Sequence, residues 1–187
     1  SVIITLYNYA DYIDICMKSV LNSNFKDIEI IIVNDCSTDD SLSRCQAFLP
    51  CAMPITIIDK QTNTGLVHSR NHGIQQARGD YVFILDADNA VYPECLKEHL
   101  KTMRSNSSLI ACYAAIEMFD ETGAFFGRNS NGPFNFKKLH GGNYIDAMAM
   151  FNRKKLITIG AYDEHLLNHG IGYEDYKLWL KIGQQKK

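Results

Sequence analysis

Two carboxylates, Asp86 and Asp88, directly follow the apolar run Tyr-Val-Phe-Ile-Leu at residues 81–85. This run has the length and the β-branched and aromatic content of a buried strand. Residues i and i+2 of an extended chain point to the same side, so both carboxylates face one small volume. Two anions held close together repel each other unless a cation lies between them. The pattern indicates a divalent-metal site at the carboxyl end of a central strand. The alternative is a polar turn that caps the next helix.

Apolar runs of strand length alternate with segments of helical spacing over the first hundred residues. The runs predict strands at residues 1–6, 28–33, 55–58 and 81–85. A helix is expected after each strand, and the second helix carries Leu42, Cys45 and Leu49 on its apolar face. This alternation indicates an α/β protein with a largely parallel sheet covered by helices on both sides. In such sheets, ligands bind beyond the carboxyl ends of the strands.

Residues 105–187 are less regular. The patterns predict strands at 109–119, 124–126 and 147–151, loops at 127–143 and 165–172, and a short helix or turn at 154–159. A final helix is expected over residues 173–182. Its spacing places Asp175 on the same face as Leu178, Trp179 and Ile182, so this carboxylate should point toward the buried side.

The composition excludes several classes of protein. Hydrophobic residues make up 46% of the chain, charged residues 21%, and the net charge is −2, so nothing suggests nucleic-acid or membrane-surface binding. No apolar stretch approaches about 18 residues and no signal peptide is visible, so no membrane-spanning segment is expected. The six cysteines lack zinc-ligand spacing, which favours reduced thiols in a cytosolic protein. A local bridge between Cys45 and Cys51 stays open. Because Ser1 begins inside an apolar run, we expect a piece of a longer chain.

Six segments in order carry a family resemblance that covers nearly the whole chain. They are residues 1–8, 29–39, 63–73, 79–88, 160–164 and 172–179. Together they resemble glycosyltransferase family 2, whose members transfer sugars from nucleoside diphosphate donors. The resemblance implies a GT-A fold, a three-layer α/β/α arrangement with a mostly parallel central sheet and a Rossmann-like N-terminal half. It implies one domain over residues 1–187, with a nucleotide-sugar-binding half at 1–104 and a less regular acceptor-binding, catalytic half at 105–187.

By this resemblance, Asp86-Ala87-Asp88 is the Asp-x-Asp motif of the donor site. Asp88 would bind Mg²⁺ or Mn²⁺ together with the donor diphosphate. Asp86 would contact the ribose or support the metal shell. Carboxylate and phosphate oxygens suit these hard cations, which stabilise the charge on a departing diphosphate.

Thr5 and Asp35 fall at the same predicted sheet edge as the Asp-x-Asp motif. The resemblance completes the nucleotide-sugar site with Thr5, Tyr7, Asp35, Asn63, Gly65 and Arg70. Asp35 would accept a hydrogen bond from a ring N–H of the base, as expected for uracil. Thr5 and Tyr7 would line the base, Tyr7 by stacking. Arg70 would lie near the base or the phosphates, and the alternative is a salt bridge to Asp86 or Asp35.

Asp175 and Glu174 match the Glu-Asp pair of the family. In inverting members the Asp is the base that takes the proton from the acceptor hydroxyl, and a carboxylate within reach can do this. The alternative is that Asp175 only caps the helix beginning there. Many members carry a metal-binding His after this helix. None follows His169 here, which leaves the third metal ligand open.

Other residues depart from the family or lie outside its motifs. Cys36 stands where the family commonly has Gly, which suggests a turn that does not require positive φ. His68 and His72 have metal-ligand spacing without a third ligand, so exposed helix positions are expected. Asn143 and Tyr144 are candidates for acceptor contact. The aromatic cluster expected to pack rather than to bind sugar consists of Phe125, Phe126, Phe134 and Phe136.

The resemblance predicts a metal-dependent inverting transferase that uses a UDP-sugar and a saccharide or lipid-linked acceptor with a hydroxyl group. A role in bacterial surface polysaccharide synthesis is expected, in the cytoplasm or at the inner membrane face. The alternative is a non-catalytic nucleotide-sugar-binding module of a larger protein. A phosphoacceptor signalling domain is disfavoured, because such a domain needs paired acids where Thr5-Leu6-Tyr7 stands.

Overall fold

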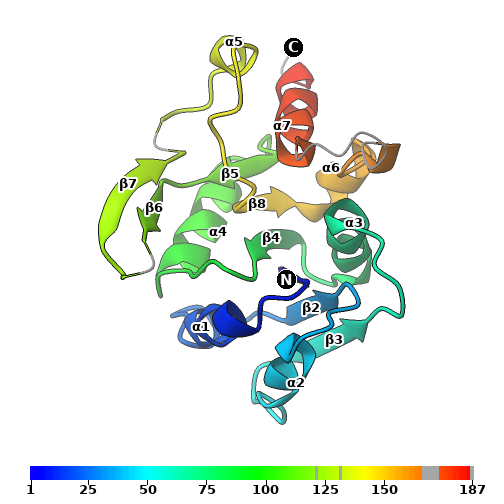
Figure 1. Ribbon diagram of the computed structural model, residues 1–187. Coiled ribbons are helices and arrows are strands. Elements are labelled where there is room, and N and C mark those ends of the chain that lie inside the picture. Colours follow the sequence, from blue (N-terminus) through cyan, green and yellow to red (C-terminus); the bar gives the residue numbers. More distant parts are fainter. Residues whose placement is uncertain (121, 131, 166–172, 186–187) are drawn as a thin grey trace.

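A computed structural model describes residues 1–120, 122–130, 132–165 and 173–185 (Figure 1). His169 and residues 166–172 of the predicted loop over 165–172 lie outside these residues. A central sheet of six strands has the order β3-β2-β1-β4-β8-β5. Its strands are β1 (Val2–Leu6), β2 (Ile30–Asn34), β3 (Ile55–Asp59), β4 (Tyr81–Asp86), β5 (Ala111–Tyr113) and β8 (Ala149–Asn152). Strands β1 to β4 pair in parallel, whereas β8 is antiparallel to both β4 and β5. The mostly parallel sheet agrees with the prediction.

Helices cover both faces of this sheet. They are α1 (Ala10–Leu21), α2 (Ser41–Gln46), α3 (Leu66–Gln76), α4 (Cys95–Ser105), α5 (Phe136–Leu139), α6 (Arg153–Thr158) and α7 (Glu174–Gln184). The apolar faces of α1, α2 and α4 pack on one side of the sheet, and those of α3, α6 and α7 on the other. None of the helices in the described residues is long and apolar enough to cross a membrane.

Side-chain alternation along the strands explains why both faces are buried. In β1, Ile4 belongs to the core with α1 and α4, whereas its neighbour Ile3 belongs to the core with α3 and α7. Strand β4 follows the same rule, with Leu85 on the first side and Ile84 on the second. A strand buried on both faces needs a continuous apolar run, and this is the pattern that predicted these strands.

The strand register aligns the polar residues at the carboxyl edge. Leu6 lies opposite Asn34 on β2, and Thr5 lies opposite Asp86 on β4. Asp35 follows β2 directly, and its N–H donates to the carbonyl oxygen of Leu6 at 2.8 Å. The first two strands and the Asp-x-Asp motif therefore end at one level.

The second half differs from prediction at two points. The predicted strand at 109–119 is divided, because the chain leaves β5 at the exposed Ala114 and Ala115. It continues as β6 (Ile116–Phe119), which pairs with β7 (Phe125–Asn129) in a separate two-stranded sheet. The predicted loop over 127–143 is wrong, since it contains the end of β7 and helix α5.

Two local predictions in the first half are wrong. Leu49 is 45% exposed rather than part of an apolar helix face, because α2 ends at Gln46. Leu49 precedes Pro50, and the residue before a proline disfavours helical geometry. Cys36 has φ of +64°, so the turn after β2 does adopt the left-handed conformation that glycine favours.

Candidate functional site

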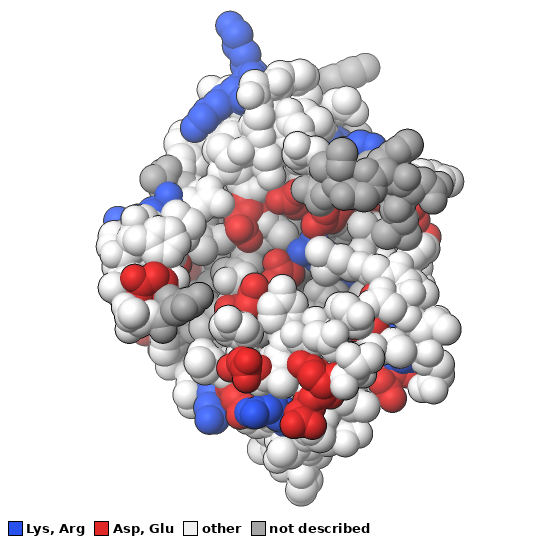
Figure 2. Space-filling model, viewed as in Figure 1, with Lys and Arg blue, Asp and Glu red and all other residues white. Residues whose placement is uncertain are grey.

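A cleft of about 720 Å³ opens at the carboxyl edge of β1, β2 and β4. Ligand pockets in proteins have volumes of roughly 300–1,000 Å³. The cleft is lined by every predicted donor-site residue except Arg70, namely Thr5, Tyr7, Asp35, Asn63, Gly65, Asp86, Ala87 and Asp88. Figure 2 shows acidic side chains gathered around the hollow in the middle of this face. The fold thus brings together residues from four separate segments of the sequence.

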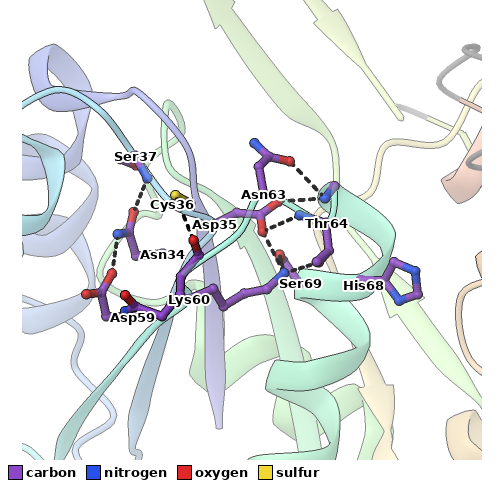
Figure 3. A network of polar contacts seen from close by, with 12 residues as sticks. Asn34, Asp35, Cys36, Ser37, Asp59, Lys60, Asn63, Thr64, His68 and Ser69 are labelled. Atoms are coloured by element: carbon purple, nitrogen blue, oxygen red, sulfur yellow. Dashed lines mark hydrogen bonds and ion pairs between the residues drawn. The ribbon is translucent and has the colours of Figure 1, made fainter.

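Asp35 is held at one end of the cleft and is only 4% exposed. Its Oδ1 accepts hydrogen bonds from Lys60 Nζ at 2.6 Å and from the N–H of Thr64 at 3.0 Å. Its Oδ2 accepts one from the N–H of Gly65 at 2.7 Å. Figure 3 shows this carboxylate between the turn at 63–65 and the Lys60 side chain. Lys60 was not predicted as a site residue, although it follows the predicted third strand almost directly.

Gly65 is shaped by its backbone conformation. Its φ of +89° and ψ of 164° lie in a region that is almost exclusive to glycine. This conformation turns the chain into α3 and points the Gly65 N–H at Asp35. The same N–H also lies 3.0 Å from Asn63 Oδ1, which accepts from it. Gly65 and Asn63 therefore build the backbone turn that closes this end of the cleft.

The two aspartates of the Asp-x-Asp motif have different surroundings. Asp86 ends β4, is half-buried, and its Oδ1 accepts from Arg70 Nη2 at 2.7 Å. Asp88 lies exposed in the cleft. Partial burial raises the pKa of the Asp88 carboxyl, and the negative charges of Asp86 and Asp146 raise it further. Asp146 was not predicted. It comes from the segment just before β8, so only the placement of β8 beside β4 brings it here.

Arg70 lies behind the Asp-x-Asp motif rather than in the cleft. Its side chain is 2% exposed and pairs with Asp86 and, through Nη1, with Glu174 Oε1 at 2.9 Å. The guanidinium also lies 5.2 Å from the centre of the Tyr162 ring. Of the two predicted roles for Arg70, the structure therefore contains the salt bridge to Asp86. The pairing with Glu174 adds a link between β4 and the beginning of α7.

Asn71 supports the same junction from the next position of α3. Its amide nitrogen donates to the carbonyl oxygen of Tyr162 at 2.9 Å and to Glu164 Oε1 at 2.8 Å. Its amide oxygen accepts from the N–H of Tyr162 at 3.1 Å. Consecutive residues of one helix thus hold two segments of the second half.

Asp175 lies in the first turn of α7. Its Oδ2 accepts from Asn143 Nδ2 at 2.9 Å, and its Oδ1 accepts from the N–H of Tyr176 at 2.6 Å. Burial raises the pKa of the Asp175 carboxyl, and the nearby Glu174 adds to this, against the hydrogen bonds that lower it. The N-cap position of α7 is Tyr173 and no side chain of the described residues caps this helix, so the alternative interpretation of Asp175 as the helix cap is wrong. Asp175 instead contacts Asn143, a predicted acceptor-side residue.

Several secondary predictions meet a mixed outcome. His68 and His72 are half-buried rather than exposed, and His68 Nδ1 lies 3.3 Å from Glu164 Oε2. Within the described residues, no group of three His, Cys, Asp or Glu side chains is arranged to hold a metal. All six cysteines are free, so the bridge between Cys45 and Cys51 is not formed.

The aromatic cluster divides into two parts. Phe134 and Phe136 pack against the core beside α7, as predicted. Phe125 and Phe126 are 55% and 63% exposed on β7, so the packing prediction is wrong for them. The reason is the separate β6–β7 sheet, which carries these side chains away from the core. Tyr144 is committed locally, because its hydroxyl accepts from the N–H of Asn135 at 2.6 Å.

A family model described as glycosyl transferase family 2 matches residues 1–160. The chain belongs to this family. An uncharacterized glycosyltransferase of Haemophilus influenzae is 28% identical over 193 residues, which cover 98% of this chain and 60% of that protein. Chondroitin synthase of Escherichia coli is 28% identical over 98% of this chain and 26% of its own length. This family 2 chain therefore spans 60% or less of these two relatives.

Solved structures share the GT-A fold with this family 2 chain. TarS of S. aureus, residues 1–349, superposes with a TM-score of 0.75 at 21% identity, over 97% of this chain and 54% of that one. TarS structures also exist with UDP and with UDP-GlcNAc. A mannosyltransferase of Pyrobaculum calidifontis, solved with GDP-Man and Mn²⁺, gives 0.72 at 18% identity, over 98% of this chain and 51% of that one. The predicted fold class is confirmed.

Proposed function

We propose that this chain transfers a sugar from a nucleoside diphosphate donor, with UDP favoured, to a hydroxyl group of a saccharide or lipid-linked acceptor. The observation that carries the proposal is the cleft. The cleft has Asp35, a buried side chain that could accept a hydrogen bond from the ring N–H of a base, at one end, and Asp86 and Asp88 at the other. The pairing of Arg70 with Asp86 and Glu174 holds the beginning of α7, which carries Asp175, near this second end. Membership of family 2 and the fold shared with UDP- and GDP-Man-bound structures support it.

We assign residues 1–104 to donor binding and residues 105–187 to the acceptor and catalysis, within one domain. The match to the family model runs across this boundary to residue 160. Strand β8, from the second half, pairs with β4 from the first, which supports one continuous unit.

In the donor half, the Asp35 side chain would accept a hydrogen bond from the N3–H of uracil. Thr5 and Tyr7 line the same cleft, and the 45% exposed ring of Tyr7 is free to stack on a base. The UDP-bound structures of a chain with the same fold favour uridine, whereas the GDP-Man-bound structure keeps guanine, which also has a ring N–H, as the competitor.

Asp88 is the residue we assign to Mg²⁺ or Mn²⁺, with Asp86 in support. The fit rests on charge. Burial raises the pKa of the Asp88 carboxyl, the negative charges of Asp86 and Asp146 raise it further, and a cation would relieve this repulsion. Oxygen donors suit both cations. Asp86 already shares one oxygen with Arg70, so the protein offers few free ligands. A bound cation would neutralise the charge that develops on the departing diphosphate. We expect Asp88 to hold metal weakly until a nucleotide adds its phosphates.

Asp175 is the base in this proposal. It takes the proton of the acceptor hydroxyl while that oxygen attacks the anomeric carbon. The carbon–oxygen bond to the diphosphate breaks from the opposite face, so the configuration inverts. Asn143 orients the carboxylate, and Glu174 anchors the helix through Arg70. A raised pKa suits this task, because it makes the carboxylate a better proton acceptor.

Relatives named chondroitin synthase support a place in polysaccharide synthesis, and we propose bacterial surface polysaccharide made on the cytoplasmic side of the membrane. The test begins with a thermal-shift panel of UDP-, GDP-, dTDP- and CMP-linked sugars, with and without Mn²⁺. A binding nucleotide raises the melting temperature according to its concentration relative to Kd. If no nucleotide does so even with metal, the donor-site assignment is wrong.

Hydrolysis of the best donor then separates an enzyme from a binding module. We expect hydrolysis by the native chain, loss of it in Asp175→Asn, and unchanged donor binding in that variant. Asp27→Asn, at an exposed carboxylate in the segment before β2, serves as a control. Donor binding without any turnover would favour the non-catalytic module.

A further inference from the structure

We propose that Lys60 sets the base specificity of the donor site, by fixing Asp35 as a hydrogen-bond acceptor. The inference rests on the proposed function and assigns a residue that no motif of the sequence analysis contains. Lys60 would act through Asp35 without touching the nucleotide, so it is a positioning residue.

The backbone of Lys60 is fixed by the sheet. Lys60 follows β3 directly, and its N–H donates to the carbonyl oxygen of Asn34 at 3.0 Å, which continues the pairing of β3 with β2. Asp35 is the next residue after Asn34. The register of two neighbouring strands therefore brings Lys60 to Asp35, and the side chain of Lys60 is only 13% exposed.

The ammonium group of Lys60 has a partner for each of its N–H donors. It donates to Asp35 Oδ1 at 2.6 Å, to Ser69 Oγ at 3.0 Å and to Thr64 Oγ1 (Figure 3). An ammonium group has three donors and no acceptor. Lys60 therefore has nothing left to offer a ligand, and it does not line the cleft.

Asp35, by contrast, lines the cleft and keeps capacity on one oxygen. Oδ1 accepts from Lys60 and from the N–H of Thr64, whereas the contact found for Oδ2 in the described part of the chain is the N–H of Gly65. A carboxylate oxygen can accept two hydrogen bonds. The Lys60 contact turns one oxygen away from the cleft and leaves Oδ2 for the ligand.

This arrangement selects for bases with a ring N–H. Lys60 Nζ and the N–H groups of Thr64 and Gly65 all donate to Asp35, so its side chain acts as an acceptor toward each of them. The remaining lone pair of Oδ2 is therefore presented to the base as an acceptor as well. Uracil N3–H and guanine N1–H can donate to it. Cytosine N3 is itself an acceptor and would face a second acceptor, which leaves both unsatisfied. Without Lys60, the Asp35 carboxylate loses the contact that holds Oδ1 and is free to rotate.

The experiment compares UDP, CDP and N3-methyl-UDP, which lacks the ring N–H, by isothermal titration calorimetry with Mn²⁺. A hydrogen bond to a charged group contributes about 1.5–3 kcal/mol, so the native chain should prefer UDP to both analogues by roughly 10- to 100-fold. Lys60→Met should weaken the binding of UDP about tenfold. It should also reduce the preference for UDP over CDP and over N3-methyl-UDP to within about threefold. Lys26→Met, on an exposed lysine that contacts the carbonyl of Leu21, should leave them unchanged.

The outcomes separate this inference from the proposed function. If UDP does not bind the native chain, the donor-site proposal fails. If UDP binds but Lys60→Met keeps the full preference over CDP and N3-methyl-UDP, Lys60 does not set specificity while the donor site stands. Should Lys60→Met fail to fold, Lys60→Arg retains a cation and should keep the preference at weaker affinity. In addition, equal binding of UDP and N3-methyl-UDP by the native chain would overturn the inference without any variant.

Discussion

Two buried pairs of cation and carboxylate mark the two ends of the cleft, and they differ in what they connect. The pair of Lys60 and Asp35 joins residues 25 positions apart, both at the carboxyl edge of the first half. Arg70 joins Asp86, 16 positions away, to Glu174, 104 positions away. The first pair shapes one binding group within a half. The second links the end of β4 to the beginning of α7, so the proposed recognition of the base and the proposed alignment of the catalytic helix fall to separate networks.

Asp175→Asn removes the proposed base beside Arg70 and Glu174, and we expect it to have the largest effect on turnover. General-base catalysis contributes about 10²- to 10⁴-fold, so we expect kcat to fall by that factor. Because Asp35 and its partners are untouched, the Kd for UDP should stay within about twofold. Single-turnover transfer and calorimetry measure the two quantities. An equal loss of binding would mean that the two ends are not separate.

The pH profile of the native chain tests the same group. The base must be ionised to accept a proton, and burial raises the pKa of Asp175 above its ordinary value. We therefore expect kcat to decline on the acidic side at a pH above that of an exposed aspartate. Asn143→Ala removes a hydrogen bond to the carboxylate and should move this limb to higher pH. A limb that stays in place would argue against Asp175 as its source.

Arg70→Met tests how far the second network holds the halves together. Removing one partner of a buried ion pair costs about 3–5 kcal/mol, because the other charge is left unpaired. We expect the free energy of unfolding in urea to fall by about that amount. Glu174→Gln, which keeps a hydrogen-bond acceptor, should cost less. Arg44→Met, which breaks an exposed pair with Asp14, should change stability by less than about 1 kcal/mol.

Gly65→Ala acts at the recognition end. A residue with a Cβ is strained at this φ and ψ by about 1–3 kcal/mol, and relief of the strain would turn the N–H away from Asp35. We expect weaker UDP binding, while any remaining turnover still depends on Asp175. Gly132→Ala, where an added Cβ meets no atom within 4 Å, is the control for stability. Unchanged UDP affinity would show that the turn is not needed.

Cys36→Gly gives the smallest expected effect, and it has the opposite sign. The left-handed conformation costs a residue with a Cβ roughly 1–2 kcal/mol, and glycine avoids this cost. The greater conformational entropy of glycine in the unfolded chain offsets part of the gain in stability. We expect the melting temperature to rise by a few degrees with UDP binding unchanged. A lower melting temperature would indicate that the contact of Cys36 Sγ with the carbonyl oxygen of Gln61, at 3.6 Å, outweighs the strain.

Sequence reasoning predicted the parts of the fold that depend on local pattern. The four parallel strands and their carboxyl-edge residues follow from apolar runs and the residues after them. Lys60 was within reach of the same rule, because it comes at the end of a predicted strand. Its partner depended on which strands are neighbours, and the alternating pattern does not specify that order.

The rest of the site depends on contacts between distant segments. Asp146 lies near Asp88 because β8 inserts antiparallel between β4 and β5. The apolar pattern of residues 147–151 predicts a strand but not its place in the sheet. The pairing of Arg70 with Glu174 likewise joins segments whose proximity arises from packing of α7 on the sheet. Cys36 was misjudged because its side chain suggests an ordinary conformation, whereas the turn requires a left-handed one.

Ser69 and Arg70 are adjacent on α3, and each belongs to a different network. Ser69 accepts a hydrogen bond from Lys60, while Arg70 holds Asp86 and Glu174. One peptide bond therefore connects the residue that contacts Lys60 with the residue that pairs with Asp86 and Glu174. In the proposed reaction, a base seated against Asp35 restrains Lys60 and Ser69 and, through them, Arg70. Binding energy from the base would then be spent on catalysis, so donors lacking the nucleoside should lose rate as well as affinity.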